Sequence, residues 1–312
     1  MVSARRQMNM SVKGNIFDGF HEGELFKHLN SGWNKYFNIY PQLPFTKIFV
    51  IEGLNINEKE KDFLLKTNID YTICDKENKP IMCIEFDGMS YGYSRGNKYI
   101  QIKPDSMRKK KLELKIKIAS EHCFPFYIVS YDEKRYVSEK IYLSVVDGII
   151  GQTIAKMDFK DLMEKYISEE RDALEAMNEY ERHEKIQDMV TYVEVDLELN
   201  WDPIAKMVSE IESILFQRNI AYSTTYRPLS RPELPDFKGI EDIEGLKKRI
   251  EAFKNIEWHG YEVICETYKG KVSETAWVRN IESNWASPMI IAKNVAELLA
   301  LYSAAILHGI VI

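Results

Sequence analysis

Three acidic residues stand in two short apolar segments of the 312-residue chain. Asp70 begins the β-rich run Ile-Asp-Tyr-Thr-Ile-Cys, and Glu85 and Asp87 end the run Ile-Met-Cys-Ile-Glu-Phe-Asp. Residues two apart on a strand point to the same face, so Glu85 and Asp87 should emerge together. If the two segments pair as a hairpin, Asp70 lies near the same end. We therefore expect three carboxylates to converge at one edge of an apolar sheet.

Such crowding favours a bound cation, because like charges a few ångströms apart repel and one carboxylate must otherwise take up a proton. Mg²⁺ or Mn²⁺, which prefer oxygen ligands, would resolve this conflict at Asp70, Glu85 and Asp87. Such an ion lowers the pKa of a bound water and stabilises charge on an attacked phosphate. The alternative is that each aspartate is an ordinary turn or strand-edge residue. Burial of two unpaired acids at a strand end would cost roughly several kcal/mol each, which weighs against that alternative.

Basic residues follow these acids along the chain. Arg108-Lys109-Lys110-Lys111, with Lys115 and Lys117, lie on a predicted helix that Asp105 precedes. A basic helix beside carboxylates suits a phosphodiester backbone running over the site, although a solvated helix face would show the same pattern. The preceding loop mixes aromatic, small and basic residues, and we expect it to contact bases or phosphates if it has a binding role. The predicted nucleic-acid-binding residues are Tyr91, Arg95, Lys98, Lys110, Lys111 and Lys115.

The two halves of the chain differ in charge. Residues 1–150 carry 23 lysines and arginines against 19 aspartates and glutamates, whereas residues 151–312 carry 19 against 29. A basic half joined to an acidic half indicates that only the first half meets a polyanion, unless the drift in surface charge has no purpose. The second half contains no defensible chemical motif. Partner binding, homodimerisation and autoinhibition through residues 190–312 all remain open.

The hydrophobic patterns predict an α/β fold whose core is a mixed sheet flanked by helices. In the first half we expect helices over residues 20–36, 105–121 and 136–157, and strands over residues 46–53, 69–74, 81–86 and 124–130. In the second half we expect strands over residues 191–199, 261–268 and 272–278, helices over 203–217, 240–255 and 288–307, and a loop over 226–235. The predicted divisions are an N-terminal extension (1–15), a first domain (16–157), a polar helical connector (158–189) and a second α+β domain (190–312).

Composition narrows the class of protein. The four cysteines lack metal-ligand spacing and the six histidines are scattered, so neither a disulfide framework nor a zinc site is expected. Residues 1–15 lack the apolar stretch of a signal peptide. The apolar stretch over residues 295–312 is interrupted by polar side chains and is interpreted as a buried helix, so no membrane span is expected. These features predict a cytoplasmic protein.

The acidic motifs resemble the PD-(D/E)XK superfamily of restriction-endonuclease-like nucleases, and most closely a bacterial branch related to very-short-patch-repair endonucleases. The resemblance covers about residues 15–132. Its supporting matches are Glu22 on the first helix, Asp70-Tyr71, Ile84-Glu85-Phe86-Asp87-Gly88, Asp105-Ser106-Met107-Arg108, and Phe124-Pro125 before the last strand. Where the branch has a histidine three residues after the glycine, this chain has Tyr91.

The resemblance implies a restriction-endonuclease-like core in which Asp70, Glu85 and Asp87 ligate the metal. It also implies that the usual catalytic lysine is replaced by Asp87, and that its positive charge returns from Arg108, Lys109 or Lys115. Asp105 would orient that cation or complete the metal shell.

We therefore expect a Mg²⁺-dependent (or Mn²⁺-dependent) endonuclease that acts on DNA more readily than on RNA. Phage defence, repair and mobile-element biology are the settings that fit such an enzyme. The alternative functions are an inactive nuclease-like module that binds nucleic acid or protein, and an interaction protein that works through its C-terminal half.

Overall fold

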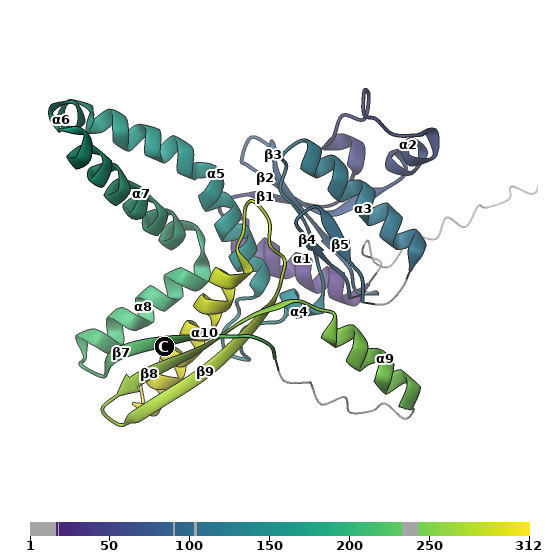
Figure 1. The fold of residues 1–312 in the computed structure, drawn as a ribbon. Coiled ribbons are helices and arrows are strands. Elements are labelled where there is room, and N and C mark those ends of the chain that lie inside the picture. Colours follow the sequence, from purple (N-terminus) through teal and green to yellow (C-terminus); the bar gives the residue numbers. More distant parts are fainter. Residues whose placement is uncertain (1–16, 18, 90, 103–104, 233–242) are drawn as a thin grey trace, which may run out of the picture.

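The computed structural model describes residues 17, 19–89, 91–102, 105–232 and 243–312, and its fold is mixed α/β (Figure 1). The first half contains α1 (Phe20–Trp33), β1 (Asn38–Pro44), the 3₁₀ helix η1 (Phe45–Lys47), α2 (Glu58–Leu65), β2 (Asn68–Cys74), β3 (Pro80–Phe86), β4 (Tyr93–Arg95), β5 (Lys98–Ile100), α3 (Ser106–Glu121), β6 (Phe126–Val129) and α4 (Tyr131–Lys134). The second half contains α5 (Val145–Glu169), α6 (Arg171–Ala176), α7 (Glu179–Trp201), α8 (Pro203–Gln217), β7 (Ala221–Leu229), α9 (Ile243–Lys254), β8 (Trp258–Thr267), β9 (Gly270–Arg279) and α10 (Pro288–Leu307).

The central sheet has the strand order β1-β2-β3-β6 and is mixed, as the sequence predicts. β1 and β3 both run antiparallel to β2, and β6 runs parallel to β3. Leu25 and Leu29 of α1 pack with Tyr71 on one face of this sheet. On the other face, Leu112 and Ile116 of α3 pack with apolar residues of β3 and β6. The sheet is therefore enclosed by helices on both sides.

The first predicted strand is wrong in position. Residues 46–53 form the end of η1 and turns, whereas the strand is β1, which begins eight residues earlier along the chain. Phe49 and Ile51 are apolar because they are buried in the cluster beneath α3, not because they lie in a sheet. β1 contains Pro41 and Pro44, which an edge strand tolerates because it has no second neighbour to hydrogen-bond.

The strand predicted over residues 191–199 is also wrong, because this segment is part of α7. Its buried residues are Met189, Val193 and Leu197, which recur every four positions and so follow the period of a helix. They pack against Met163 of α5 and Leu174 of α6. α5, α6 and α7 together form an arm that projects from the rest of the molecule (Figure 1).

The C-terminal sheet has the order β7-β8-β9 and is antiparallel. The predicted hairpin and the helices that follow residues 202 and 287 are confirmed as β8–β9, α8 and α10. The predicted loop over residues 226–235 is wrong at its start, because β7 extends to Leu229; residues 233–235 lie outside the described residues. α10 is long and apolar enough to cross a membrane, but 61% of its apolar window is buried within the protein.

One buried cluster crosses the predicted domain boundaries. It contains Leu29 of α1 and Ile149 of α5 together with Ile204 of α8, Val263 of β8 and Leu301 of α10. Burial of apolar surface is the main favourable contribution to folding, so these elements stabilise one another. The two halves of the chain share this core.

Candidate active site

A cleft of about 610 Å³ opens at one end of the central sheet. It is lined by α1, β1, α2, β2, β3 and α3, with Tyr131 of α4 at one side. Among the residues predicted from the sequence, those that line it are Glu22, Asp70, Glu85, Arg108, Lys111 and Lys115. Asp87, Asp105, Lys109 and Lys110 are absent from this lining. Only part of the predicted site therefore lines the cleft, and the remaining predicted residues lie outside it.

Asp70 lies on β2, on the neighbouring strand to Glu85 of β3. Its Oδ2 accepts a hydrogen bond from the backbone N–H of Phe86 at 2.8 Å, and its Oδ1 accepts one from Nε2 of Gln42 at 3.1 Å. Burial raises the pKa of the Asp70 carboxyl, and these hydrogen bonds, together with the charge of Lys115, offset only part of that rise. The Asp70 carboxyl is thus fixed in position by hydrogen bonds and partly desolvated within the cleft.

Gln42 of β1 joins Asp70 to Glu22 of α1. Its side-chain Nε2 donates to Oδ1 of Asp70 and also to Oε1 of Glu22. Its φ of 54° places it in the left-handed region, where residues other than glycine are uncommon and often functional. Tyr71 fixes α1 to β2 through a 2.7 Å hydrogen bond from its hydroxyl to the carbonyl of Glu22. The structure therefore brings Glu22 and Asp70 together around one amide nitrogen.

Lys115 is the basic residue that reaches the carboxylates. It is only 4% exposed, and its Nζ lies 2.5 Å from Oε1 of Glu85 and 2.7 Å from the carbonyl oxygen of Asn68. Burial raises the pKa of Glu85 to about 8, although the charge of Lys115 acts in the opposite direction. Asp70 adds to the rise because a second negative charge nearby disfavours ionisation. Glu85 and Lys115 thus form a buried pair that faces the cleft.

Asp87 makes contacts of a different kind from those predicted. It is 1% exposed, and its Oδ2 accepts hydrogen bonds from the N–H of Gly92 at 2.9 Å and from the hydroxyl of Tyr99. Its Oδ1 lies 2.9 Å from Nε of Arg108. Both oxygens therefore have partners in the protein. Asp87 fixes the β4–β5 hairpin and the start of α3 to the end of β3, and it does not join Asp70 and Glu85 in a three-carboxylate cluster.

The predicted metal-ligand set does not assemble as expected. The part of the chain that the structure describes holds no group of three or more histidine, cysteine, aspartate or glutamate side chains placed to bind one metal ion. The carboxylates in the cleft are instead divided between the Glu22–Gln42–Asp70 contacts and the Glu85–Lys115 pair.

Asp105 and Lys109 lie outside the cleft chemistry. The Asp105 carboxylate accepts hydrogen bonds from the N–H groups of Met107 and Arg108, each at 3.0 Å, and so caps the first turn of α3. Lys109 is exposed and lies 3.8 Å from Glu113 one turn further along the helix. The structure assigns Asp105 a structural role at the start of α3, and this corrects the catalytic role expected from the sequence.

The predicted nucleic-acid contacts are placed unevenly. Lys111 lines the cleft and lies 5.3 Å from the ring of Phe63, whereas Lys98 and Lys110 are exposed elsewhere on the surface. Arg95 forms an ion pair with Glu257. Tyr91 packs against Tyr131, with 5.3 Å between ring centroids. Lys111 is thus the predicted surface lysine best placed to meet a phosphate over the cleft.

Sequence reasoning missed three residues that line the cleft: His21, Gln42 and Lys66. Nδ1 of His21 lies 2.9 Å from Oε2 of Glu24, and the ring packs edge-on against Tyr131 at 4.6 Å. Gln42 lies between two prolines in a segment interpreted as a break, so no pattern marked it. His21 immediately precedes Glu22, and that adjacency on a predicted helix was the available signal.

The comparisons with protein-family models, with curated proteins and with solved structures found no match to this chain. The assignment of a function therefore rests on the residues and geometry of the cleft.

Proposed function

We propose that the protein is a metal-dependent nuclease of the restriction-endonuclease-like type, and that it hydrolyses phosphodiester bonds in DNA. The observation that carries this proposal is the meeting of Asp70, Glu85 and Lys115 in one cleft. They come from β2, β3 and α3, which are far enough apart in sequence that only the fold brings them together. Two acids and a lysine are the side chains that phosphodiester hydrolysis uses to bind a metal and to stabilise charge on phosphate.

The order of the elements supports the same proposal. The motifs that resemble the superfamily lie on a first helix carrying Glu22, on β2, on β3, at the start of α3 and just before β6. The first strand follows that helix, and β1, β2 and β3 form a meander to which β6 adds in parallel. Such an arrangement places the ends of β2 and β3 beside α3, where Asp70, Glu85 and Lys115 lie.

The residues of the cleft fit a divalent cation in one specific respect. Oxygens of Glu22 and Asp70 both lie within hydrogen-bond distance of the single Gln42 Nε2, so two carboxylates already converge on one polar hydrogen-bond donor. A Mg²⁺ ion replacing that donor would be held by Glu22 and Asp70, with Glu85 beside them. When bound, the ion would supply a water of lowered pKa and a positive charge for the phosphate.

The chain's own residues account for the other requirements of the reaction. Lys115 would stabilise negative charge that develops on the phosphate, and Arg108 and Lys111 at the cleft wall would bind the flanking backbone. His21 would carry the proton transfer that the resemblance assigns to a histidine where this chain has Tyr91. Its ring lies on the cleft wall, and an imidazole can both accept and donate a proton.

A non-catalytic nucleic-acid-binding module is the second candidate. The pairing of Glu85 with Lys115 at 2.5 Å favours it, because both groups then satisfy each other without a metal. The same cleft and the same basic side chains would then hold a nucleic-acid backbone without cutting it.

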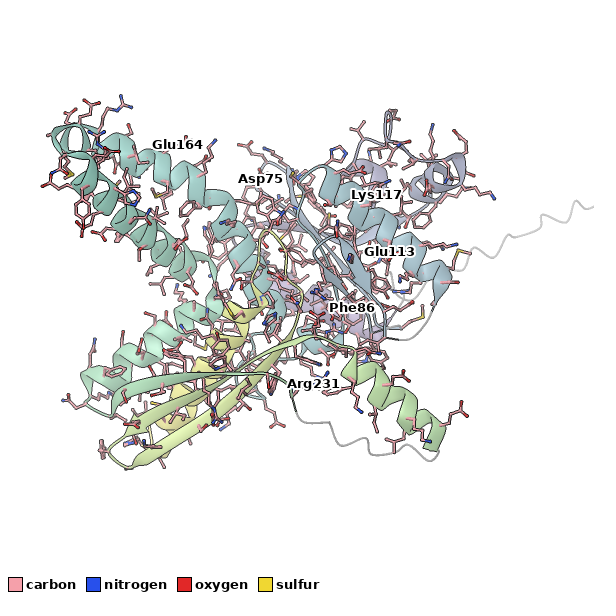
Figure 2. All side chains as sticks on the ribbon, in the orientation of Figure 1. Asp75, Phe86, Glu113, Lys117, Glu164 and Arg231 are labelled. Atoms are coloured by element: carbon pink, nitrogen blue, oxygen red, sulfur yellow. The ribbon has the colours of Figure 1, made fainter. Side chains whose placement is uncertain are left out.

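Plasmid nicking by the full-length protein distinguishes the two candidates. With Mg²⁺ or Mn²⁺ we expect the wild type to nick supercoiled DNA faster than it cleaves an RNA of equal length. Asp70→Asn and Lys115→Met should each lower the rate by about 10²–10³-fold, the usual effect of removing one group that stabilises the transition state. Glu113→Gln, a half-exposed residue of the same α3 outside the cleft lining (Figure 2), is the control and should nick at the wild-type rate.

Titration with Mn²⁺ alone provides a second measurement. The proposal requires heat of binding in the wild type and its loss in Asp70→Asn. If the protein binds DNA but does not nick it at any tested metal concentration, the nucleic-acid-binding module replaces the nuclease as the proposed function. Equal nicking by the wild type and both variants would remove the assigned residues from the reaction.

A further inference from the structure

A second cavity lies well away from the cleft, where the arm meets the rest of the molecule. It has a volume of about 360 Å³ and is lined by α5, α7, the α7–α8 junction and the loop over residues 282–287. Its volume falls within the range of small-molecule sites, roughly 300–1,000 Å³, and is far larger than a single water requires. We call it the arm pocket.

Two residues that line the arm pocket each have a buried side-chain polar atom with no hydrogen-bond partner among the described residues. One is Oδ2 of Asp202, a side chain that is 1% exposed. The other is Nε2 of Gln152. The other polar atom of each side chain already has a partner: Oδ1 of Asp202 accepts from the N–H of Ile204 at 2.9 Å, and Oε1 of Gln152 accepts from the N–H of Ser287 at 2.8 Å. Buried polar atoms are nearly always paired, so an acceptor and a donor in this pocket await a partner.

Most charged residues of the arm pocket lie on two helices, and Glu282 of the loop adds a further carboxylate. Glu194 and Glu198 lie on α7, eight and four positions before Asp202, which caps the end of that helix, so the three carboxylates follow one line along it. Gln152 and Lys156 lie one turn apart on α5 and supply hydrogen-bond donors. Like charges at this spacing destabilise a helix, and a positively charged group beside α7 would relieve that effect.

The burial of Asp202 also favours a positively charged ligand group on this side of the pocket. It raises the pKa of Asp202 to about 7, with a further rise from the charge of Glu198. A carboxyl in this state gains from a cationic hydrogen-bond donor, because a charge-assisted hydrogen bond favours the ionised form. A phosphate or nucleotide would meet the acidic side of the pocket unfavourably.

Much of the remaining wall is apolar, beside Ser283, Asn284 and Ser287 of the loop. Phe159 of α5, Leu197 of α7 and Trp285 of the 282–287 loop all line the cavity, together with Ala155 and Ala286. A ligand with an apolar or aromatic body would bury its surface against these side chains, and that burial is favourable.

We propose that the arm pocket binds a free α-amino acid with an apolar side chain. The ammonium group would lie against Asp202 and Glu198, and the carboxylate would lie against Gln152 and Lys156. The apolar side chain would contact Trp285 and Phe159. This ligand class supplies both a donor for the orphaned acceptor and an acceptor for the orphaned donor, whereas a simple ammonium ion only donates and a simple carboxylate only accepts.

Calorimetry on the full-length protein tests the ligand's two ends without any mutation. The probes are L-phenylalanine, phenethylamine, which lacks the carboxylate, and 3-phenylpropionate, which lacks the ammonium group. We expect L-phenylalanine to bind, and each analogue to bind at least about tenfold more weakly, the effect of losing one hydrogen bond to a charged group. An analogue that binds as tightly as L-phenylalanine would overturn the assignment of its missing group.

A variant tests the position of the ligand. Asp202→Asn keeps an oxygen that caps α8, because asparagine is as good an N-cap as aspartate, but it removes the negative charge. We expect it to weaken L-phenylalanine binding at least about tenfold. Glu164→Gln removes one carboxylate from the distal part of α5 (Figure 2), outside the pocket lining, and should bind as the wild type does.

The outcomes that overturn the proposal are direct. Unchanged binding by Asp202→Asn would place the ligand elsewhere. A ligand that binds only the folded state must raise the melting temperature of the protein. If none of the standard amino acids raises it at millimolar concentration, the arm pocket is a water-filled cavity.

Discussion

Two buried ion pairs in this molecule have opposite surroundings. Glu85 and Lys115 meet at the wall of the cleft, and Arg279 of β9 pairs with Glu133 of α4 in the interior. The pKa of Glu85 rises to about 8 because burial outweighs the charge of its lysine partner. For Arg279, burial acts to lower the pKa, but the charges of Glu133 and Asp132 raise it overall.

The difference lies in how completely each charge is satisfied. Arg279 is 0% exposed, and besides Glu133 it donates to the carbonyl of Tyr91 at 2.8 Å and to the hydroxyl of Ser130 at 2.9 Å. Its guanidinium also lies 4.4 Å from the ring centroid of Tyr93. Glu85 has one cationic partner and a neighbouring carboxyl, Asp70. A buried ion pair whose charges are fully partnered therefore stabilises the fold. A carboxylate that is only partly neutralised beside a cleft can instead take part in a reaction.

The largest expected effect comes from breaking the interior pair. Arg279→Met leaves Glu133 buried without a counter-charge, so we expect a loss of about 3–5 kcal/mol in the free energy of unfolding, measured by urea denaturation. The control is Lys160→Met, which removes an exposed ion pair with Glu164 and should cost less than about 1 kcal/mol. Equal losses in the two variants would show that the interior network adds nothing to stability.

The pH dependence of stability tests the other pair of this comparison, Glu85 and Lys115 at the cleft. Glu85 has a pKa of about 8 when folded and an ordinary value of 4.5, so between these values the folded state holds a proton that the unfolded state releases. The free energy of unfolding should therefore fall as pH rises through that window, and the contribution is fully present below it. Glu85→Gln should flatten this profile in urea denaturation. Parallel profiles for the wild type and the variant would mean that Glu85 ionises normally.

The smallest expected effect concerns Asp105, which the sequence placed in the active site. Asp105→Ala removes the cap of α3 and should cost about 1 kcal/mol of stability, while nicking per folded molecule should stay at the wild-type rate. Asp105→Asn retains the cap and should be nearly neutral in both measurements. A fall in nicking by Asp105→Asn at full stability would return this residue to the chemistry.

Much of the fold follows from local sequence signals. The β2–β3 hairpin, the cap and helix at Asp105, the Asp202-Pro203 start of α8 and the β8–β9 hairpin are confirmed. Each combines a turn or cap residue with an apolar period, so two signals agree. The segment over residues 191–199 offered alternation alone, and the longer helical period that begins at Met189 decided its structure.

The site was predictable only in part, because its residues are set by tertiary contacts. Asp70 and Glu85 were found from their strands, and Lys115 was named as one of several candidate cations. That Lys115, and not Lys109, reaches Glu85 depends on which side of α3 faces the sheet. Asp87 shares the spacing of a ligand, but the β4–β5 hairpin supplies it with Tyr99 and Gly92. No local pattern in the sequence contains that contact.

The interior pair also has a consequence for the order in which the protein can mature. Glu133 meets Arg279 only after 146 further positions have been synthesised. Chains emerge from the ribosome N-terminus first, so until β9 has been made the nascent first half has Glu133 without the charge of Arg279 and the Tyr91 carbonyl without the hydrogen bond from Arg279. We expect a growing or prematurely terminated chain to lack a finished cleft, which would confine the proposed nuclease activity to molecules whose synthesis has passed β9.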